Sequence, residues 1–401
     1  MKVLHLWVTL LAVSSSLFSQ EAISLDSYIS ENKKDIFSYD YKKNEEEGLI
    51  LRDSWISPII LNYSYSKSNP FEQVQTNQAA AIKMDQAIFR GGGIFYSVKF
   101  ANASKKYSDY SVDVAKRKMI KDTISILMQI KQTDLKIAKQ ELQIKNADIN
   151  LELKKEQYLS GQLDSGFLDN AIIERNAAIA ALYDIQTSQE RLISSFQTLS
   201  DLDYNTAKIP HLELIDEEEF LKYNISLDMA NIQVERDEHN KGVTRAKYLP
   251  VISVTAGYNW TKTDAPVAVF GSPERDNYDY GIKATMPLDI NTFRDIESAK
   301  VDYLKSELLA QDKEKELKAL FEQVIQNIDN FEKKITLSLE NMDIYTKLLM
   351  DTRELFKAGY KTQYDVETLE NSVNISIKDS KILELDKQIE LLNLYEMYVN
   401  D

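Results

Sequence analysis

The sequence contains no cysteine in its 401 residues. Disulfides, thiolate metal sites, cysteine nucleophiles and lipid attachment through an N-terminal cysteine are therefore excluded. Glycine and proline are also scarce, at 11 and 7 residues. Because these two residues end or bend helices, their scarcity favours long uninterrupted helices.

Histidine is also scarce, and the chain has no net positive charge. The three histidines, His5, His211 and His239, stand apart, and no catalytic set is visible around them. Carboxylates are abundant, but they fall on polar helix faces, where a run of charge is usually a solvated surface. The net charge of −15 argues against nucleic acid as a partner. We predict no enzyme activity, no cofactor and no metal site.

Long hydrophobic runs are missing, apart from a short one near the N-terminus. Met1 and Lys2 precede the apolar run 3–13, and serines follow it up to Ser19. This order is typical of a secretory signal peptide, which we place at residues 1–20; a buried N-terminal helix is the alternative. The run is too short to span a membrane as a helix. We therefore expect an exported protein.

What the sequence does contain is an internal repeat. Pro58 matches Pro250, and Gly161 matches Gly359, which lies 198 residues further on. Repeats this long are duplicated half-domains, and each copy is expected to run helix, strand, strand, long helix, glycine turn, helix. The expected parts of the mature chain are a first repeat at 21–199, a connecting segment at 200–226 and a second repeat at 227–401.

The two long helices carry an apolar seven-residue repeat, which is typical of coiled-coil packing. In the first copy a second stripe lies two residues from the first, about 200° around the helix. Stripes on opposite flanks indicate a neighbour on each side, as in a closed ring of helices; a bulky helical bundle is the alternative. The stripes are Ile130, Ile137, Ile144, Leu151 and Tyr158, then Leu135, Leu142 and Ile149, and in the second copy Ile328, Ile335, Met342, Leu349 and Phe356.

Four segments of alternating apolar and polar residues form two expected strand hairpins, at about 56–89 and 250–287. In the first segment Leu61 and Tyr63 lie on one face and Asn62 on the other. Such segments match transmembrane β-strands, and a soluble sheet with one wet face has the same alternation. Open sheet edges are not tolerated in lipid, so two chains would give eight strands and three chains twelve. The four segments are 57–65, 80–89, 251–260 and 278–286.

Three adjacent glycines, Gly91, Gly92 and Gly93, fall where the second strand ends and the long helix begins. The backbone changes there from extended to helical, and glycine alone reaches positive φ at little cost. We interpret the three as a strand-to-helix hinge, with Asn and Asp serving at 289–292 in the second copy. A phosphate-binding loop is disfavoured, because the spacing does not match a dinucleotide fingerprint.

At this point the residues resemble a family, the TolC-like outer-membrane channel proteins of Gram-negative bacteria. The resemblance covers essentially the whole mature chain and rests on YLPVISV at 248–254, QAIFRGG at 86–92 and AGYKTQYDV at 358–366. It implies a mainly α fold with a small β part: a long α-helical barrel that crosses the periplasm and a twelve-stranded transmembrane β-barrel completed by trimerisation. The connecting segment 200–226 would belong to a belt around its middle.

The resemblance also implies a function and partners. The protein would be the outer-membrane component of a tripartite efflux or type I secretion system, a passive exit duct embedded in outer-membrane lipid. A periplasmic adaptor (membrane fusion) protein and an inner-membrane pump, proton-driven or of the ABC type, would work with the homotrimer. The alternative is a periplasmic coiled-coil adaptor or tether without its own channel.

A periplasmic gate is expected at the two glycine turns, Gly161 and Gly359, where each long helix reverses. The resemblance makes Asp365 the acidic tip position, six residues after the second glycine, whereas the first turn has Phe167 there. Carboxylates repeated around a narrow mouth would attract cations; ordinary solvated turn residues are the alternative. The gate residues so predicted are Asp164, Asp169, Lys361, Asp365 and Glu367.

Overall fold

The computed structural model describes residues 25–69, 74–264 and 274–399, so the signal peptide expected at 1–20 lies outside the described residues. Its elements follow the order helix, two strands, long helix, helix, and then repeat that order. They are η1 (Leu25–Tyr28), α1 (Glu31–Asp53), β1 (Ile60–Ser68), β2 (Gln75–Phe89), α2 (Gly93–Leu159), α3 (Ser165–Leu199), α4 (Glu217–Lys222), α5 (Ile225–Ala246), β3 (Val251–Asp264), β4 (Glu274–Thr285), α6 (Thr292–Lys357) and α7 (Gln363–Tyr395).

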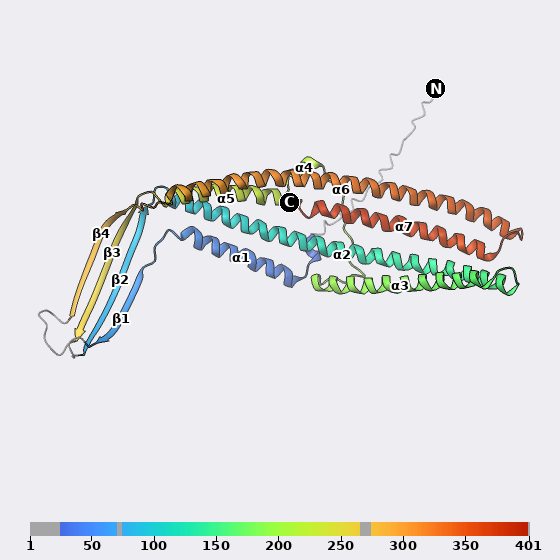
Figure 1. Ribbon diagram of the computed structural model, residues 1–401, viewed down its shortest axis with the longest axis horizontal. Coiled ribbons are helices and arrows are strands. Elements are labelled where there is room, and N and C mark those ends of the chain that lie inside the picture. Colours follow the sequence, from blue (N-terminus) through green and yellow to red (C-terminus); the bar gives the residue numbers. More distant parts are fainter. Residues whose placement is uncertain (1–24, 70–73, 265–273, 400–401) are drawn as a thin grey trace, which may run out of the picture.

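The molecule is elongated, with the four strands at one end and helix turns at the other (Figure 1). Helix α2 has 67 residues and α6 has 66, which at 1.5 Å per residue makes each about 100 Å long. Their length follows from the sequence, since neither helix contains a proline, and glycine occurs only as the first residue of α2. Among the described residues, none of the helices combines the length and apolarity that a bilayer crossing requires.

The helices form an arc in which shorter helices lie end to end. Helix α2 contacts α1 and α3 as well as α5 and α7, and α6 contacts α5 and α7. Figure 1 shows α1 and α3 following one another along α2, and α5 and α7 doing the same between α2 and α6. The order across the arc is therefore α1/α3, α2, α5/α7, α6. The two-flank stripe predicted for the first long helix fits this arrangement, because α2 has neighbours on both sides.

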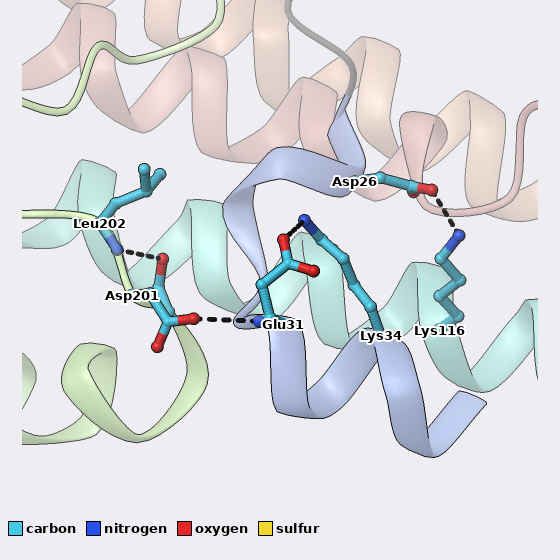
Figure 2. A network of polar contacts seen from close by, with 7 residues as sticks. Asp26, Glu31, Lys34, Lys116, Asp201 and Leu202 are labelled. Atoms are coloured by element: carbon cyan, nitrogen blue, oxygen red, sulfur yellow. Dashed lines mark hydrogen bonds and ion pairs between the residues drawn. The ribbon is translucent and has the colours of Figure 1, made fainter. Parts of the chain in front are cut away.

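Two joints hold the end-to-end helices together at the middle of the molecule. At the first, the Ser30 amide donates to the Leu199 carbonyl at 2.8 Å, and the Glu31 amide donates to the Asp201 carboxylate at 2.9 Å. Figure 2 shows this joint, with Lys116 of α2 paired to Asp26 beside it. At the second, the Ile225 amide donates to the Met397 carbonyl at 2.9 Å. The start of α1 is thus hydrogen-bonded to the end of α3, and the start of α5 to the residues that follow α7.

The hydrophobic core lies at these joints, halfway along the long helices. Residues from η1, α2, α3, the 200–224 connection, α6 and the end of α7 meet there. The most deeply buried side chains are Tyr28, Ile124, Leu127, Phe196, Phe220, Leu317 and Leu394, each at most 2% exposed. Toward both ends of the molecule the helices lie side by side in a single layer, so much apolar surface is left uncovered within one chain.

The strands form one antiparallel sheet in the order β1-β2-β3-β4. The two expected hairpins are therefore joined, because β2 pairs with β3 along its length. The strands also run further than the alternation indicated: β2 starts at Gln75 rather than Ala80, and β4 at Glu274 rather than Tyr278. These extensions are polar, and the backbone ladder continues through them because its hydrogen bonds do not need apolar side chains. Parts of both loops, 70–73 and 265–273, lie outside the described residues.

Candidate functional site

The sheet has one apolar face and one polar face, and the strand register aligns each across all four strands. Leu61 pairs with Ile82, which pairs with Tyr258, which pairs with Tyr278. Among the described residues no helix covers this apolar face, since Leu61 is 72% exposed and Tyr280 82%. The apolar residues of this face are Leu61, Tyr63, Ala80, Ile82, Met84, Ile252, Val254, Ala256, Tyr258, Trp260, Tyr278, Tyr280 and Ile282; the register also places Gln86 and Asp276 on it. Exposed apolar surface of this extent marks an interface with lipid or protein.

The opposite, polar face carries charges and small residues. Lys83 of β2 pairs with Gly257 of β3, which pairs with Asp279 of β4. Two residues further along β2, Asp85 accepts a hydrogen bond from the Lys283 ammonium at 2.7 Å across the width of β3. The polar face consists of Asn62, Ala81, Lys83, Asp85, Ser253, Thr255, Gly257, Asn259, Asp279, Gly281 and Lys283.

The three glycines between β2 and α2 play two different parts. Gly91 and Gly92 have φ of +56° and +84°, so the backbone leaves the sheet through the left-handed region, as the sequence predicted. Gly93 does not: it is the first residue of α2, and a Cβ there would lie 2.9 Å from that of Ala246. Its small size permits the start of α2 to approach the end of α5. At the second junction Asn291, the N-cap of α6, has φ of −87°, so that residue does not use the left-handed region.

The two turns at the far end are built alike. Gly161 has φ of +74° and Gly359 has φ of +80°. After each glycine the next amide reaches back to the helix, from Gln162 to the Gln157 carbonyl and from Tyr360 to the Leu355 carbonyl, both at 2.9 Å. This is the Schellman ending, in which a left-handed glycine satisfies the last helix carbonyls. The turn glycines are thus explained by helix termination.

The predicted gate residues begin the helices that follow these turns. Asp164 is the N-cap of α3 and accepts from the Gly166 amide at 2.8 Å. Asp365 closes a capping box with Thr362 in α7, each side chain accepting from the backbone of the other. Asp169 is exposed, and Glu367 accepts from the Gln363 amide group at 3.0 Å. The residue matching Asp164 by the 198-residue offset is Thr362, so both turns are capped at the same position.

Lys361 and Asp365 are brought together within one turn, their charged atoms 3.7 Å apart and both side chains exposed. The Thr362 backbone N–H holds the pKa of Asp365 below its ordinary value, and the Thr362 hydroxyl and Lys361 act in the same direction. Asp365 therefore stays ionised at neutral pH. Within the part of the chain that the structure describes, no hydrogen bond or ion pair joins the gate residues of one turn to those of the other.

A feature that sequence reasoning missed is a polar ladder between α2 and α7, toward the turns. The Gln132 amide donates to Asp386 at 2.6 Å, the Lys139 ammonium to Asp379 at 2.6 Å and the Asn371 amide to Asn146 at 2.8 Å. The α2 members are spaced by seven residues and lie two residues after the apolar stripe of Ile130, Ile137 and Ile144. That heptad spacing of polar residues was the available signal. The ladder thus adds hydrogen bonds and an ion pair to the contact between the two helical hairpins.

Comparison with known proteins places the fold, with its one-sided sheet, among those of TolC-like outer-membrane channels. Residues 218–398 match the family model of outer membrane efflux proteins. This covers much of the second repeat and confirms the resemblance noted from the sequence. The family match is confined to residues 218–398, less than half of the chain, whereas the fold of a TolC-like channel extends over nearly all of it. No curated protein matches the chain significantly in sequence.

Solved structures match nearly the whole chain. VceC, an outer membrane protein of Vibrio cholerae, has a TM-score of 0.72 and 13% identity, over 94% of this chain and 95% of its own. The CmeC outer membrane channel of Campylobacter jejuni gives 0.72 and 13%, over 93% and 84%. The open state of the MtrE outer membrane channel of Neisseria gonorrhoeae gives 0.63 and 12%, over 93% and 86%. At this identity the likeness is one of fold.

Proposed function

We propose that this protein is the outer-membrane component of a tripartite efflux or type I secretion system, a passive duct across periplasm and outer membrane. The observation that carries the proposal is the sheet: four strands with an uncovered apolar face and a charged opposite face. A lysine facing lipid at mid-membrane depth costs about 2–4 kcal/mol, so Lys83 and Lys283 would face a water-filled lumen. The exposed tyrosines would then face lipid.

Closure of the duct by three copies is the second part of the proposal. Within the described residues, the outer edges of β1 and β4 have no strand partner. The arc of helices ends on α1/α3 at one side and on α6 at the other. Joining β4 and α6 of one copy to β1 and α1/α3 of the next is a head-to-tail contact, which generates a closed ring when the rotation between copies closes. Three copies of four strands give a twelve-stranded barrel.

Exposed apolar side chains along both ends of the arc support this closure. Leu288 and Phe293, beside the junction of β4 and α6, are 91% and 85% exposed. On the opposite side, Ile56 and Ile59 at the junction of α1 and β1 are 53% and 64% exposed. Others on the outer helices are Ile36, Tyr39 and Ile50 of α1, Ile173 and Tyr183 of α3, and Leu308, Leu337 and Met350 of α6. Head-to-tail closure brings these two sets together.

The same proposal places a gate at the helix turns and pump partners beyond them. Three copies would gather six turns around one mouth, with Asp164, Asp169, Asp365 and Glu367 as its acidic groups and Lys361 as its basic group. The polar ladder between α2 and α7 would let the hairpins separate, because hydrogen bonds there can exchange with water. A periplasmic adaptor and an inner-membrane pump would supply docking and energy. An N-terminal signal would export the chain to the outer membrane of a Gram-negative host.

The test is the assembly and its conductance. Native mass measurement in mild detergent should give three chains, and the trimer should be extracted only from outer-membrane fractions. In planar bilayers it should form discrete conducting events. A stable monomer in detergent-free buffer, with no conductance after reconstitution, contradicts the proposal and favours a periplasmic tether.

A further inference from the structure

The charges on the polar face of the sheet are not all neutralised. At the level of the apolar band, this face carries two lysines, Lys83 and Lys283, and two aspartates, Asp85 and Asp279. Lys283 is paired with Asp85, their charged atoms 2.7 Å apart. Asp279 instead accepts from the Asn259 amide, at 3.4 Å. Among the described residues, the Lys83 ammonium has no carboxylate within salt-bridge distance.

Lys83 and Lys283 occupy matching places in the two repeats, but their surroundings differ. Two residues after each lysine, β2 has the carboxylate of Asp85, whereas β4 has Thr285. The single aspartate reaches across β3 to Lys283, so Lys83 has lost the partner next to it. Asp279 lies on the same rung as Lys83, and their backbones are about 10 Å apart at two strand spacings. Its carboxylate leans over the intervening Gly257, 2.7 Å from where a Cβ would stand. It is the nearest remaining carboxylate on this face.

Lys83 lies at a depth where its charge would act strongly on ions in the passage. Its rung lies between those of Ala256 and Tyr258, near the middle of the band that runs from Ile252 to Trp260. Walls of low dielectric around a water-filled passage strengthen the field of a charge inside it. An unpaired ammonium at that depth therefore attracts anions along the passage. This contrasts with the chain as a whole, which carries a net charge of −15.

We propose that Lys83 is a specificity-determining residue of the duct: it attracts anionic groups, such as carboxylates or phosphates of the cargo, at membrane depth. The inference rests on the proposed function, because it requires the polar face to line the lumen. Asp279 opposes it from the same rung. The two residues should therefore shift the preference of this segment in opposite directions.

The absence of cysteine permits a direct test with a single introduced thiol. Ala81 lies on the polar face two residues before Lys83, and its neighbour Ala80 lies on the apolar face between Tyr63 and Trp260. Ala81→Cys and Ala80→Cys are thus matched reporters of equal size on opposite faces. Outer-membrane fragments bearing each are treated with anionic sulfonatoethyl or cationic trimethylammonioethyl methanethiosulfonate. The two rates are normalised to those of a free thiol in solution.

The expected result is a rate ratio at Ala81→Cys that favours the anionic reagent. One unit charge about 7 Å away in water, screened over a Debye length of about 8 Å, changes local ion concentration about 1.5-fold. Because the two reagents respond oppositely, adding Lys83→Gln should lower the ratio about twofold, and Lys83→Glu about fivefold. Asp279→Asn should raise it. Lys262→Gln, on the other face near the loop, is the control and should leave it unchanged.

The outcomes separate the two proposals. If the ratio at Ala81→Cys is the same with Lys83, Gln and Glu at position 83, Lys83 does not set the preference and the inference is wrong. If Ala80→Cys in membranes reacts as fast as Ala81→Cys, the apolar face is not in lipid, and it is the proposed function that fails. Protection of Ala80→Cys together with a charge-dependent ratio at Ala81→Cys supports both.

Discussion

Placing an arginine on one face or the other of the same strand tests which side of the sheet meets lipid. Leu61 and Asn62 are adjacent in β1 and both exposed, but they belong to opposite faces. We expect Leu61→Arg to prevent stable insertion and Asn62→Arg to be tolerated. The two variants carry the same new side chain at adjacent positions of one strand, so the main difference between them is the face on which the arginine lies.

The magnitude follows from the depth of the rung. The apolar band spans the rungs from Ile252 to Trp260, and Leu61 shares a rung with Tyr258, two residues from the centre at Ala256. At 3.3 Å per residue along a tilted strand, this is about 5 Å from mid-membrane. An arginine facing lipid there costs about 2 kcal/mol per chain, or about 6 kcal/mol for three chains. The cost for one chain alone corresponds to roughly a 30-fold change in the ratio of folded to unfolded protein.

The assay is the amount of heat-modifiable trimer in purified outer membranes, together with urea unfolding of the protein refolded into lipid vesicles. Leu61→Arg should lower the trimer at least tenfold and shift the urea midpoint downward. Asn62→Arg should change the trimer less than twofold. Equal losses in both variants, or no loss in either, would refute the assignment of the apolar face to lipid.

The remaining predictions concern the helices and their turns. Lys361→Ala should raise single-channel conductance by loosening the closed mouth, and Asp365→Asn should weaken block by multivalent cations added on the periplasmic side. Since the pKa of Asp365 is lowered on folding, its charge persists as pH falls, and this block should remain down to about pH 4 and disappear only below it; block lost near neutral pH contradicts the assignment. Gly359→Ala should cost about 1–2 kcal/mol because φ there is +80°, although nothing lies within 4 Å of the added methyl, and hydrogen exchange near the turn measures it. Lys139→Met should destabilise the α2–α7 contact by about 0.5–1 kcal/mol and raise conductance, and a double-mutant cycle with Asp379→Asn isolates the coupling.

Ser253 belongs to the polar face of the sheet, but it is not a suitable position for a large side chain. The structure leaves Ser253 only 5% exposed, next to Asp85 and the Lys283 that pairs with it. An arginine there would displace that pair, so Asn62 is the sound control position and Ser253 is not. The alternation of apolar and polar residues predicts on which face a side chain lies, but not whether a larger side chain fits there.

Much of the fold could be predicted from local patterns. The scarcity of glycine and proline and the seven-residue stripes indicated two very long helices, which α2 and α6 are. The glycines at 161 and 359 indicated helix reversals, and both have the positive φ that favours glycine. These features depend on the intrinsic preferences of a few adjacent residues, or on the period with which side chains repeat around one element. A single sequence contains both kinds of information.

Only the tertiary structure decided how the elements meet. The sequence contains no sign that β2 pairs with β3, that α1 continues α3 and α5 continues α7, or that Asp85 pairs with Lys283 rather than Lys83. For the ladder from α2 to α7, the seven-residue spacing on α2 is visible in the sequence, but its partners on α7, more than 200 residues away, are not. An amphipathic helix or strand specifies that a face will be covered, but many partners satisfy that requirement equally well. Which partner covers it depends on chain connectivity and on packing all the elements at once, and neither is encoded in one segment alone.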